Sequence, residues 1–333
     1  MKSSLSHFSG SFVFTALAVV VAWFVGGPKA ALTVAFLGAL ETSLSFDNAV
    51  VNATVLKNWD AVWRRRFLTW GMLIAVFGMR LVFPLLIVGV AGDMGPLRAI
   101  DLAINDPDEY GRVLASAHHQ IAAFGGAFLM MVFLSFFVAR HKTEHWFEML
   151  ERPLTRLGKM EAIEAALTLT LLLLMAGLLD GAQRGEFVAA GVWGVVCFIF
   201  VKGLAALLGG DEGSGHPVVR QGVAGFVYLE VLDASFSFDG VIGAFALTNN
   251  LLVIALGLGV GAMFVRSFTL LLVERGTLET YRYLEHGAFW AIGALAAVMF
   301  AGVRYHIPEA VTGLVGAALI VLSLGSSIRA NRK

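Results

Sequence analysis

Cysteine is almost absent from this sequence, and charged residues are scarce. The 333 residues include one cysteine, Cys197, so neither a disulfide nor a thiolate metal cluster can form within one chain. Only 14% of the residues are charged, whereas an ordinary soluble domain carries roughly 25%. The net charge is zero, so no basic surface points to a nucleic-acid partner. A chain with so little charge cannot cover a water-facing surface.

Long apolar runs occupy most of the chain, many of them near the ~20 residues that cross the hydrocarbon core of a bilayer. They do not alternate apolar and polar residues as barrel strands would, so they predict helices. The first run is long for a signal peptide and further runs follow at once, so we expect it to be the first helix. The predicted fold class is all-α, a polytopic membrane protein with about ten transmembrane helices. The predicted spans are 8–27, 31–56, 67–91, 118–139, 161–180, 186–208, 218–245, 250–273, 284–303 and 309–328.

Lysine and arginine are unevenly distributed among the segments that join these helices. With a cytoplasmic N-terminus, 17 of them fall on the cytoplasmic side, counting Lys202 and Arg220 near the cytoplasmic ends of their spans, and 5 fall on the other side. The remaining two, Arg80 and Arg266, lie inside spans. Cytoplasmic loops of membrane proteins carry such an excess. We therefore expect a multi-pass protein of the cell inner membrane, surrounded by the lipid bilayer, with both termini in the cytoplasm.

Two stretches of the chain repeat one pattern. Residues 41–48 read Glu-Thr-Ser-Leu-Ser-Phe-Asp-Asn, and residues 233–240 read Asp-Ala-Ser-Phe-Ser-Phe-Asp-Gly. The predicted helices that carry these motifs are separated by an odd number of crossings, so they run in opposite directions. This relation predicts a single transmembrane domain, 1–333, made of two inverted five-helix repeats, 1–180 and 181–333. Transporters with such repeats bind their substrate near the midplane, where the repeats meet.

The helices that follow the two motifs also match. Gly71 precedes Arg80 by nine residues, and Gly257 precedes Arg266 by nine residues. Both arginines lie inside predicted spans. They are either counter-charges, which neutralise an empty site and change partner when a cation enters, or halves of static salt bridges.

Five carboxylates lie inside predicted spans, at Glu41, Asp47, Glu230, Asp233 and Asp239. An ionised carboxylate at the bilayer centre costs roughly 2.5–3.5 kcal/mol on insertion scales, so such residues usually face an interior and have a function. The two intramembrane arginines can neutralise only two of the five. The remaining acids must be protonated or bind a cation.

The spacing within each motif limits how its acids can act. Positions six apart are about 120° apart around a regular helix, so Glu41 and Asp47 cannot share a face. Either the helix unwinds near Ser45–Asn48, or the two carboxylates have different neighbours. The Ser, Asn and Gly residues beside each motif aspartate favour a local break in both helices.

The available ligands are carboxylates, hydroxyls and an amide. This hard-oxygen set suits Mg²⁺, Ca²⁺ or Mn²⁺ and lacks the ligands that select zinc or copper. The predicted metal ligands are Glu41, Ser45, Asp47, Asn48, Glu230, Asp233, Ser237 and Asp239.

At these residues the chain resembles the TerC-like family of integral membrane proteins, within a branch described as a domain of unknown function. The motif at residues 41–48, its second copy at 233–240 and the segment 122–129 carry the resemblance, which extends from about residue 30 to 325. The resemblance implies export of a divalent metal, chiefly manganese, and a link to tellurite resistance. It also implies metal-binding roles for Glu41, Asp47, Asn48, Asp233 and Asp239.

The sequence leaves more than one functional class open. The favoured function is secondary transport of a divalent cation, Mn²⁺ first and Ca²⁺ or Mg²⁺ as alternatives, possibly in exchange for protons. The cation would be a substrate, and we expect no prosthetic group and no enzymatic activity. One alternative is an intramembrane aspartyl hydrolase, although the Tyr-Asp and Gly-x-Gly-Asp strings of such enzymes do not occur here. The other is a non-transporting membrane partner protein linked to metal or tellurite resistance.

Overall fold

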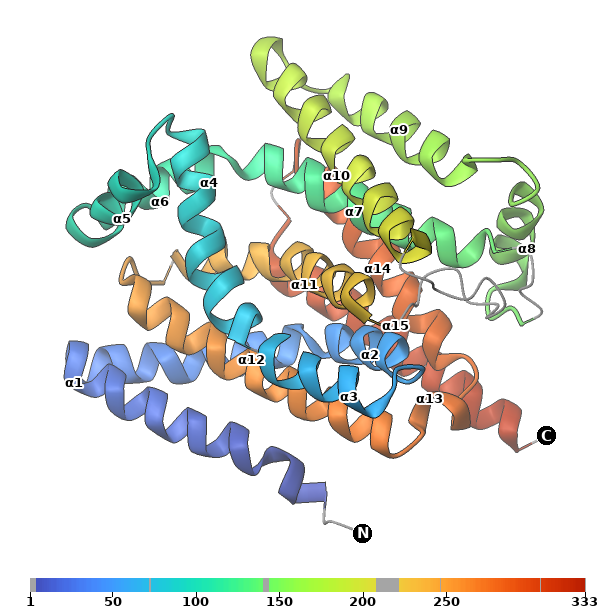
Figure 1. The fold of residues 1–333 in the computed structure, drawn as a ribbon, viewed down its shortest axis with the longest axis horizontal. Coiled ribbons are helices and arrows are strands. Elements are labelled where there is room, and N and C mark those ends of the chain that lie inside the picture. Colours follow the sequence, from blue (N-terminus) through green and yellow to red (C-terminus); the bar gives the residue numbers. More distant parts are fainter. Residues whose placement is uncertain are drawn as a thin grey trace.

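A computed structural model describes residues 4–71, 73–139, 144–207, 222–245, 247–305 and 307–332. Every regular element in these ranges is helical, which confirms the predicted all-α class (Figure 1). The elements are α1 (Ser4–Leu44), α2 (Phe46–Leu56), α3 (Ala61–Arg66), the π-helical segments η1 (Phe67–Gly71) and η2 (Ile74–Val82), α4 (Phe83–Ala91), α5 (Pro96–Asn105), α6 (Pro107–Ser116), α7 (His118–Phe137), α8 (Glu148–Leu157), α9 (Ile163–Ala176), α10 (Gly181–Leu207), α11 (Gly222–Phe245), α12 (Leu251–Glu274), α13 (Thr277–Thr280), α14 (Leu284–Ala301) and α15 (Glu309–Asn331).

Helix α1 consists of two helical limbs joined by a sharp bend. Gly26 and Gly27 have non-helical backbone, with a φ of 69° at Gly27, and Pro28 follows directly. Only glycine adopts such a φ without strain, and proline removes a helical hydrogen bond. The two limbs fold back on each other at the left of Figure 1. The bend falls between the first two predicted spans, 8–27 and 31–56.

Seven helical stretches in the described ranges are long and apolar enough to cross a membrane, as expected for a membrane protein. Two of the other predicted spans look different in the structure. Helix α9 has only 14 residues, and α11 carries Glu230, Asp233 and Asp239 along its length. The ten crossings and the inverted relation of the halves therefore stay predictions. The seven stretches are His7–Leu44, Ala61–Val90, His118–Phe137, Gln183–Leu204, Leu251–Glu274, Leu284–Ala301 and Val311–Asn331.

The helices that carry the two sequence motifs differ in continuity. The first breaks at Ser45, whose backbone (φ −100°, ψ 21°) separates α1 from α2. The second, α11, is helical from Gly222 to Phe245 and passes through the second motif without a break. The predicted break beside Asp47 is thus confirmed, and the one predicted in the second motif is wrong. Helix α11 packs on α7, α10 and η2, and tertiary packing of this kind routinely overrides the low helix propensity of a single residue such as Gly240.

The third predicted span, 67–91, consists of η1, η2 and α4 and includes π-helical turns, which frequently occur at functional sites. At Gly71, in η1, an added Cβ would lie 2.7 Å from Oε1 of Glu230 on α11. At Gly257, on α12, an added Cβ would lie 2.6 Å from Cβ of Leu37 on α1. Each of the two glycines thus lies against the motif helix of the other half of the chain.

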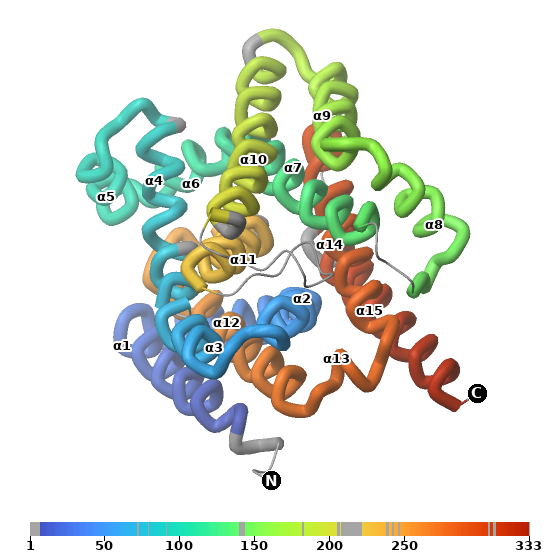
Figure 2. The backbone as a smooth tube through the Cα atoms, turned by 45° about the vertical axis from the view of Figure 1, so that its right-hand side comes forward, coloured from blue at the N-terminus to red at the C-terminus, as the bar shows by residue number. Residues whose placement is uncertain are grey.

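The rest of the fold surrounds these helices. Helix α7 lies centrally and packs on α10 and α14, and its buried side chains form the middle of the largest apolar cluster. Helices α5 and α6 extend from one edge of the molecule beside α4, and α8 and α9 lie toward the opposite edge (Figure 2). The motif helices lie between these edges, where α1, α2, α11 and α12 meet.

Candidate functional site

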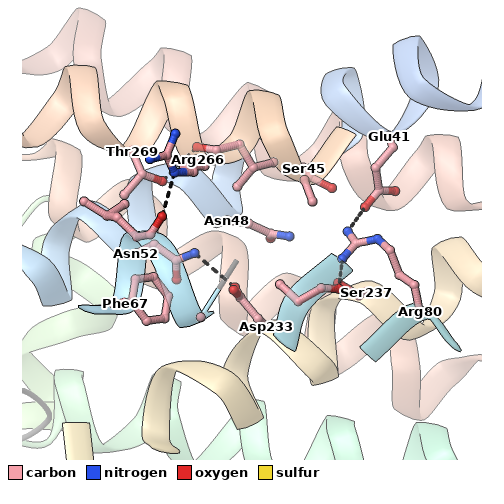
Figure 3. Close-up of a pocket in the computed structure, with 15 residues that line it drawn as sticks. Glu41, Ser45, Asn48, Asn52, Phe67, Arg80, Asp233, Ser237, Arg266 and Thr269 are labelled. Carbon is pink, nitrogen blue, oxygen red and sulfur yellow. Dashed lines mark hydrogen bonds and ion pairs between the residues drawn. The ribbon is translucent and has the colours of Figure 1, made fainter. Parts of the chain in front are cut away.

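A cavity of about 30 Å³, lined mostly by buried side chains, lies among α1, α2, the two π-helical segments, α11 and α12 (Figure 3). A water molecule needs roughly 10–15 Å³ measured in this way, so the cavity has space for about two waters or one small ion. Its polar lining comes from both halves of the chain. The polar residues that line it are Glu41, Ser45, Asn48, Asn52, Arg80, Asp233, Ser237, Arg266 and Thr269.

Glu41 and Arg80 form a buried ion pair at one end of this cavity (Figure 3). Nη2 of Arg80 donates to Oε1 of Glu41 at 3.0 Å, and the side chains are 4% and 6% exposed, arginine first. Nη1 of Arg80 also donates to the backbone oxygen of Ala75 at 2.5 Å. Arg80 therefore neutralises Glu41, as both sequence-based alternatives, the exchanging counter-charge and the static salt bridge, require.

Glycine makes room for the Glu41 carboxylate. A Cβ added at Gly240 would lie 2.9 Å from Oε2 of Glu41, and one at Gly261 would lie 2.1 Å from its Cγ. Gly240 takes the place that an asparagine holds in the first motif. The Glu41 carboxylate, from the first motif, thus occupies the space that a side chain at position 240, in the second motif, would need.

A hydrogen bond between the two motif helices lies at the other end of the cavity. Nδ2 of Asn52, on α2, donates to Oδ1 of Asp233, on α11, at 3.0 Å (Figure 3). Asn52 is 3% exposed. The bond brings the acid that begins the second motif to the helix that follows the first.

A second cavity, of about 50 Å³, adjoins the first. Asp47 lines it together with Gly240, and it is also lined by Thr312 from α15. The backbone N–H of Asn48 donates to Oδ1 of Asp47 at 3.0 Å. Three predicted site residues, Glu41, Ser45 and Asn48, line both cavities and form the wall between them.

Glu230 is buried beside this site but lines neither cavity. It is 6% exposed, and neither of its carboxylate oxygens has a hydrogen-bond partner among the described residues. Its Oε1 lies against the π-helical turn at Gly71, where an added Cβ would be 2.7 Å away. Glu230 is therefore a buried acid with no compensating donor in the described part of the protein.

The repeat suggests that Arg266, the second predicted counter-charge, pairs with a motif carboxylate as Arg80 pairs with Glu41. Its partner is instead a backbone oxygen. Its Nε donates to the backbone oxygen of Leu68 at 2.8 Å, and no ion pair with a described carboxylate accompanies this bond. The Asp239 side chain lies outside the described residues, so a cation shared by Asp47 and Asp239 stays a prediction. Ser237 is 8% exposed and lines the first cavity with Asp233.

Sequence reasoning missed two polar residues of the first cavity, Asn52 and Thr269, and only Asn52 continues the first motif. The positions Glu41, Ser45, Asn48 and Asn52 are spaced four, three and four residues apart. This spacing places polar groups on one face of a helix, so the signal was present. The motif ended at Asn48, and Asn52 lies one turn beyond it.

The site consists of dispersed oxygen-bearing side chains and not of a compact cluster of acidic or sulfur ligands. Within the described ranges, no group of three or more His, Cys, Asp or Glu side chains is arranged to hold a metal ion. The first cavity instead combines the carboxylates of Glu41 and Asp233 with the guanidinium groups of Arg80 and Arg266 and with neutral hydroxyl and amide groups. Its carboxylate, hydroxyl and amide oxygens are the kind of ligand that hard cations take.

The fold and the site define an α-helical membrane protein with a polar cavity between two related helices. A family model described as protein of unknown function (DUF475) matches residues 46–333. The chain belongs to this family. Searches of curated proteins and of solved structures find no match to the chain.

Proposed function

We propose that this protein is a secondary transporter that exports a divalent cation, with Mn²⁺ as the first candidate, through the cavity between its two motif helices. The single observation that carries the proposal is that this cavity is lined by acidic and other oxygen-bearing residues of both motifs. Buried ionisable residues in membrane helices commonly mark the path of an ion.

In this proposal each group at the cavity has a separate role. Asp233 supplies the main charge, because Asn52 donates to it but no described basic residue forms an ion pair with it. Ser45, Asn48 and Ser237 supply neutral oxygens. Glu41 becomes a ligand when the cation replaces Arg80 as its partner. Arg80 keeps a second acceptor at Ala75 when this exchange occurs.

The two adjoining cavities suggest a path across the site. Three residues line both cavities, namely Glu41, Ser45 and Asn48. A cation that passes from one cavity to the other can therefore stay in contact with these three ligands. Asp233 lies on the first cavity and Asp47 on the second. The break at Ser45 lies at the wall between them, where small backbone changes can move these ligands.

The architecture we propose is ten crossings in two inverted repeats, with both termini in the cytoplasm of an inner-membrane protein. The packing of Gly71 against Glu230 and of Gly257 against Leu37 supports it, because each helix contacts the motif helix of the other half. The same two motifs support a relationship to the TerC-like metal exporters.

Exchange with protons would follow from the ligand chemistry. A cation needs ionised carboxylates, so its entry releases any protons that they carry. We propose that the cation-free site holds at least one proton, with Glu230 as its carrier, because Glu41 is already neutralised by Arg80 whereas neither oxygen of Glu230 has a partner among the described residues.

Cation binding by the purified protein tests the proposal. We expect Mn²⁺ to bind the wild-type protein in calorimetry and Asp233→Asn to weaken binding at least tenfold. Asp101→Asn is the matched control, because it makes the same chemical change on an exposed residue of α5. Wild-type protein that binds no Mn²⁺, Ca²⁺ or Mg²⁺, or equal affinity in the two variants, would contradict the proposal.

A further inference from the structure

Helix α8 is held against the protein by a buried carboxylate outside the candidate site. Glu151 is 0% exposed. Its oxygens accept hydrogen bonds from the backbone N–H groups of Trp146 and Phe147 at 3.1 and 3.2 Å and from Nε1 of Trp290 at 3.0 Å. Nδ1 of His286 lies 3.0 Å away. These partners from α14 and from the segment before α8 fix the rotation of α8 about its own axis.

The inward face of α8 is small and well defined. Oγ1 of Thr155 donates to the backbone oxygen of Phe137 at 3.3 Å, and Leu154 packs against the main apolar cluster. Gly158, the residue that ends the helix, has space for no side chain, because an added Cβ would lie 1.9 Å from the backbone oxygen of Val138. With Glu151, these residues occupy one side of the helix.

The remaining surface of α8 has an apolar sector and a basic sector. Met149 is 89% exposed, Leu150 53% and Leu157 36%, although all three are apolar. Arg152 and Arg156 are also exposed. At about 100° per residue, the three sectors follow one another around the helix, inward, then basic, then apolar. Glu148 pairs with Arg152 at the edge of the basic sector.

The turn after α8 continues both sectors. Met160 is 58% exposed, and Lys159 is exposed beside it. An amphipathic helix with such faces lies in the membrane interface, with its apolar face in the acyl chains and its basic face among the headgroups. In α8 the third face, the inward one, packs against the rest of the protein. The position of α8, between the membrane-length helix α7 and the apolar helix α9, places it near a bilayer surface.

We propose that α8 is a lipid-binding element that lies in the bilayer interface and selects anionic phospholipids. Arg152, Arg156 and Lys159 would contact the negatively charged headgroups. Met149, Leu150 and Leu157 would enter the acyl-chain region beside them. The proposal does not depend on cation transport by the central cavity.

Lipid retention by the full-length protein tests this proposal. The protein is equilibrated in vesicles of phosphatidylcholine with phosphatidylglycerol and extracted, and its bound lipids are counted by native mass spectrometry. We expect the wild type to be enriched in phosphatidylglycerol over the bulk ratio. The triple variant Arg152→Gln/Arg156→Gln/Lys159→Gln should lose most of this enrichment. Each basic residue removed should lower the affinity for phosphatidylglycerol by up to about fivefold.

A matched control separates a local site from general charge. The variant Arg65→Gln/Arg329→Gln/Arg332→Gln removes three exposed basic residues elsewhere and should keep the wild-type enrichment. Gel filtration and thermal unfolding of each variant verify that the fold is intact. No enrichment in the wild type, or equal loss in the two triple variants, would overturn the proposal.

The apolar face has its own test. A spin label attached at position 149, in a variant whose Cys197 is replaced by Ala, reports its depth through collisions with oxygen and with a polar nickel reagent. We expect oxygen-dominated collisions in vesicles, as for a residue below the headgroups. Collisions dominated by the nickel reagent, as for a water-exposed loop, would overturn the proposed position of α8.

Discussion

Nδ2 of Asn52 donates to Oδ1 of Asp233 at 3.0 Å and thereby joins two residues that are 181 positions apart in the chain. Asn52 follows the first motif by one turn, and Asp233 begins the second. A buried hydrogen bond to a charged group is among the stronger polar contacts in a protein. This bond holds the two motif helices together at the candidate site.

Removal of the Asn52 amide should weaken both the fold and the site. Asn52→Leu keeps a similar volume but leaves a buried oxygen of Asp233 without its donor, so we expect a loss of about 1.5–3 kcal/mol of unfolding free energy. Denaturant unfolding in detergent measures it. Asn105→Leu is the control, because it removes the same kind of bond, to Asp101, at an exposed position. Equal effects of the two variants would contradict the role assigned to Asn52.

The Glu41–Arg80 pair should show strong coupling. Arg80→Gln leaves a buried carboxylate uncompensated, so we expect a loss of about 3–5 kcal/mol. Adding Glu41→Gln removes that charge and should restore a large part of the stability. Thermal unfolding of the two single variants and the double variant gives the coupling energy. Additive effects would show that the two side chains do not neutralise each other.

Completing the second motif should damage the site rather than improve it. Gly240→Asn introduces the amide found in the first motif, but its Cβ would meet Oε2 of Glu41 at 2.9 Å. We expect weaker Mn²⁺ binding and lower stability. Gly185→Asn is the control, because no heavy atom lies within 4 Å of a Cβ placed there. Stronger Mn²⁺ binding by Gly240→Asn would contradict this expectation, because it would show that the lack of an amide at position 240 limits the affinity more than crowding of Glu41 does.

The proposed topology can be tested without a structure. A reporter that is active only in the cytoplasm, fused after residue 333, should give signal. A second reporter, active only outside the cytoplasm, should give signal after Arg184, in the turn where α10 begins. Signal from only the external reporter at the C-terminus would contradict the ten crossings and, with them, the inverted repeat.

Local features were readable from the sequence, whereas packing decided the rest. The break at Ser45 and the glycine–proline bend before residue 31 follow from the conformational preferences of single residues. The continuity of α11 through Gly240 does not, because tertiary packing overrides the preference of a single residue. The pairing of Arg266 with the backbone of Leu68 also depends on contacts between distant segments.

The two buried acids outside the motif pattern illustrate the same limit. The sequence marked Glu230 as an intramembrane acid, but not that it lies against the π-helical turn at Gly71. The sequence did not mark Glu151 at all. Its partners His286 and Trp290 are 135 and 139 residues away, so no local pattern could reveal the contact.

Competition between protons and the cation should be visible in binding. Protons and Mn²⁺ compete for the same carboxylate oxygens, so affinity should fall as pH falls. Calorimetry from pH 8 to pH 5 in two buffers of different ionisation enthalpy measures both the affinity and the protons released. Affinity independent of pH, with no proton release, would contradict exchange at this site.

Ion flux in liposomes that contain the purified protein tests the central claim most directly. External Mn²⁺ and lumenal pH are followed together with two dyes, for the wild type, for Asp233→Asn and for the control Asp101→Asn. The account predicts Mn²⁺ movement with protons moving in the opposite direction, retained by the control and abolished by Asp233→Asn. Mn²⁺ flux that is no faster than in protein-free liposomes, or is unchanged by Asp233→Asn, would contradict it.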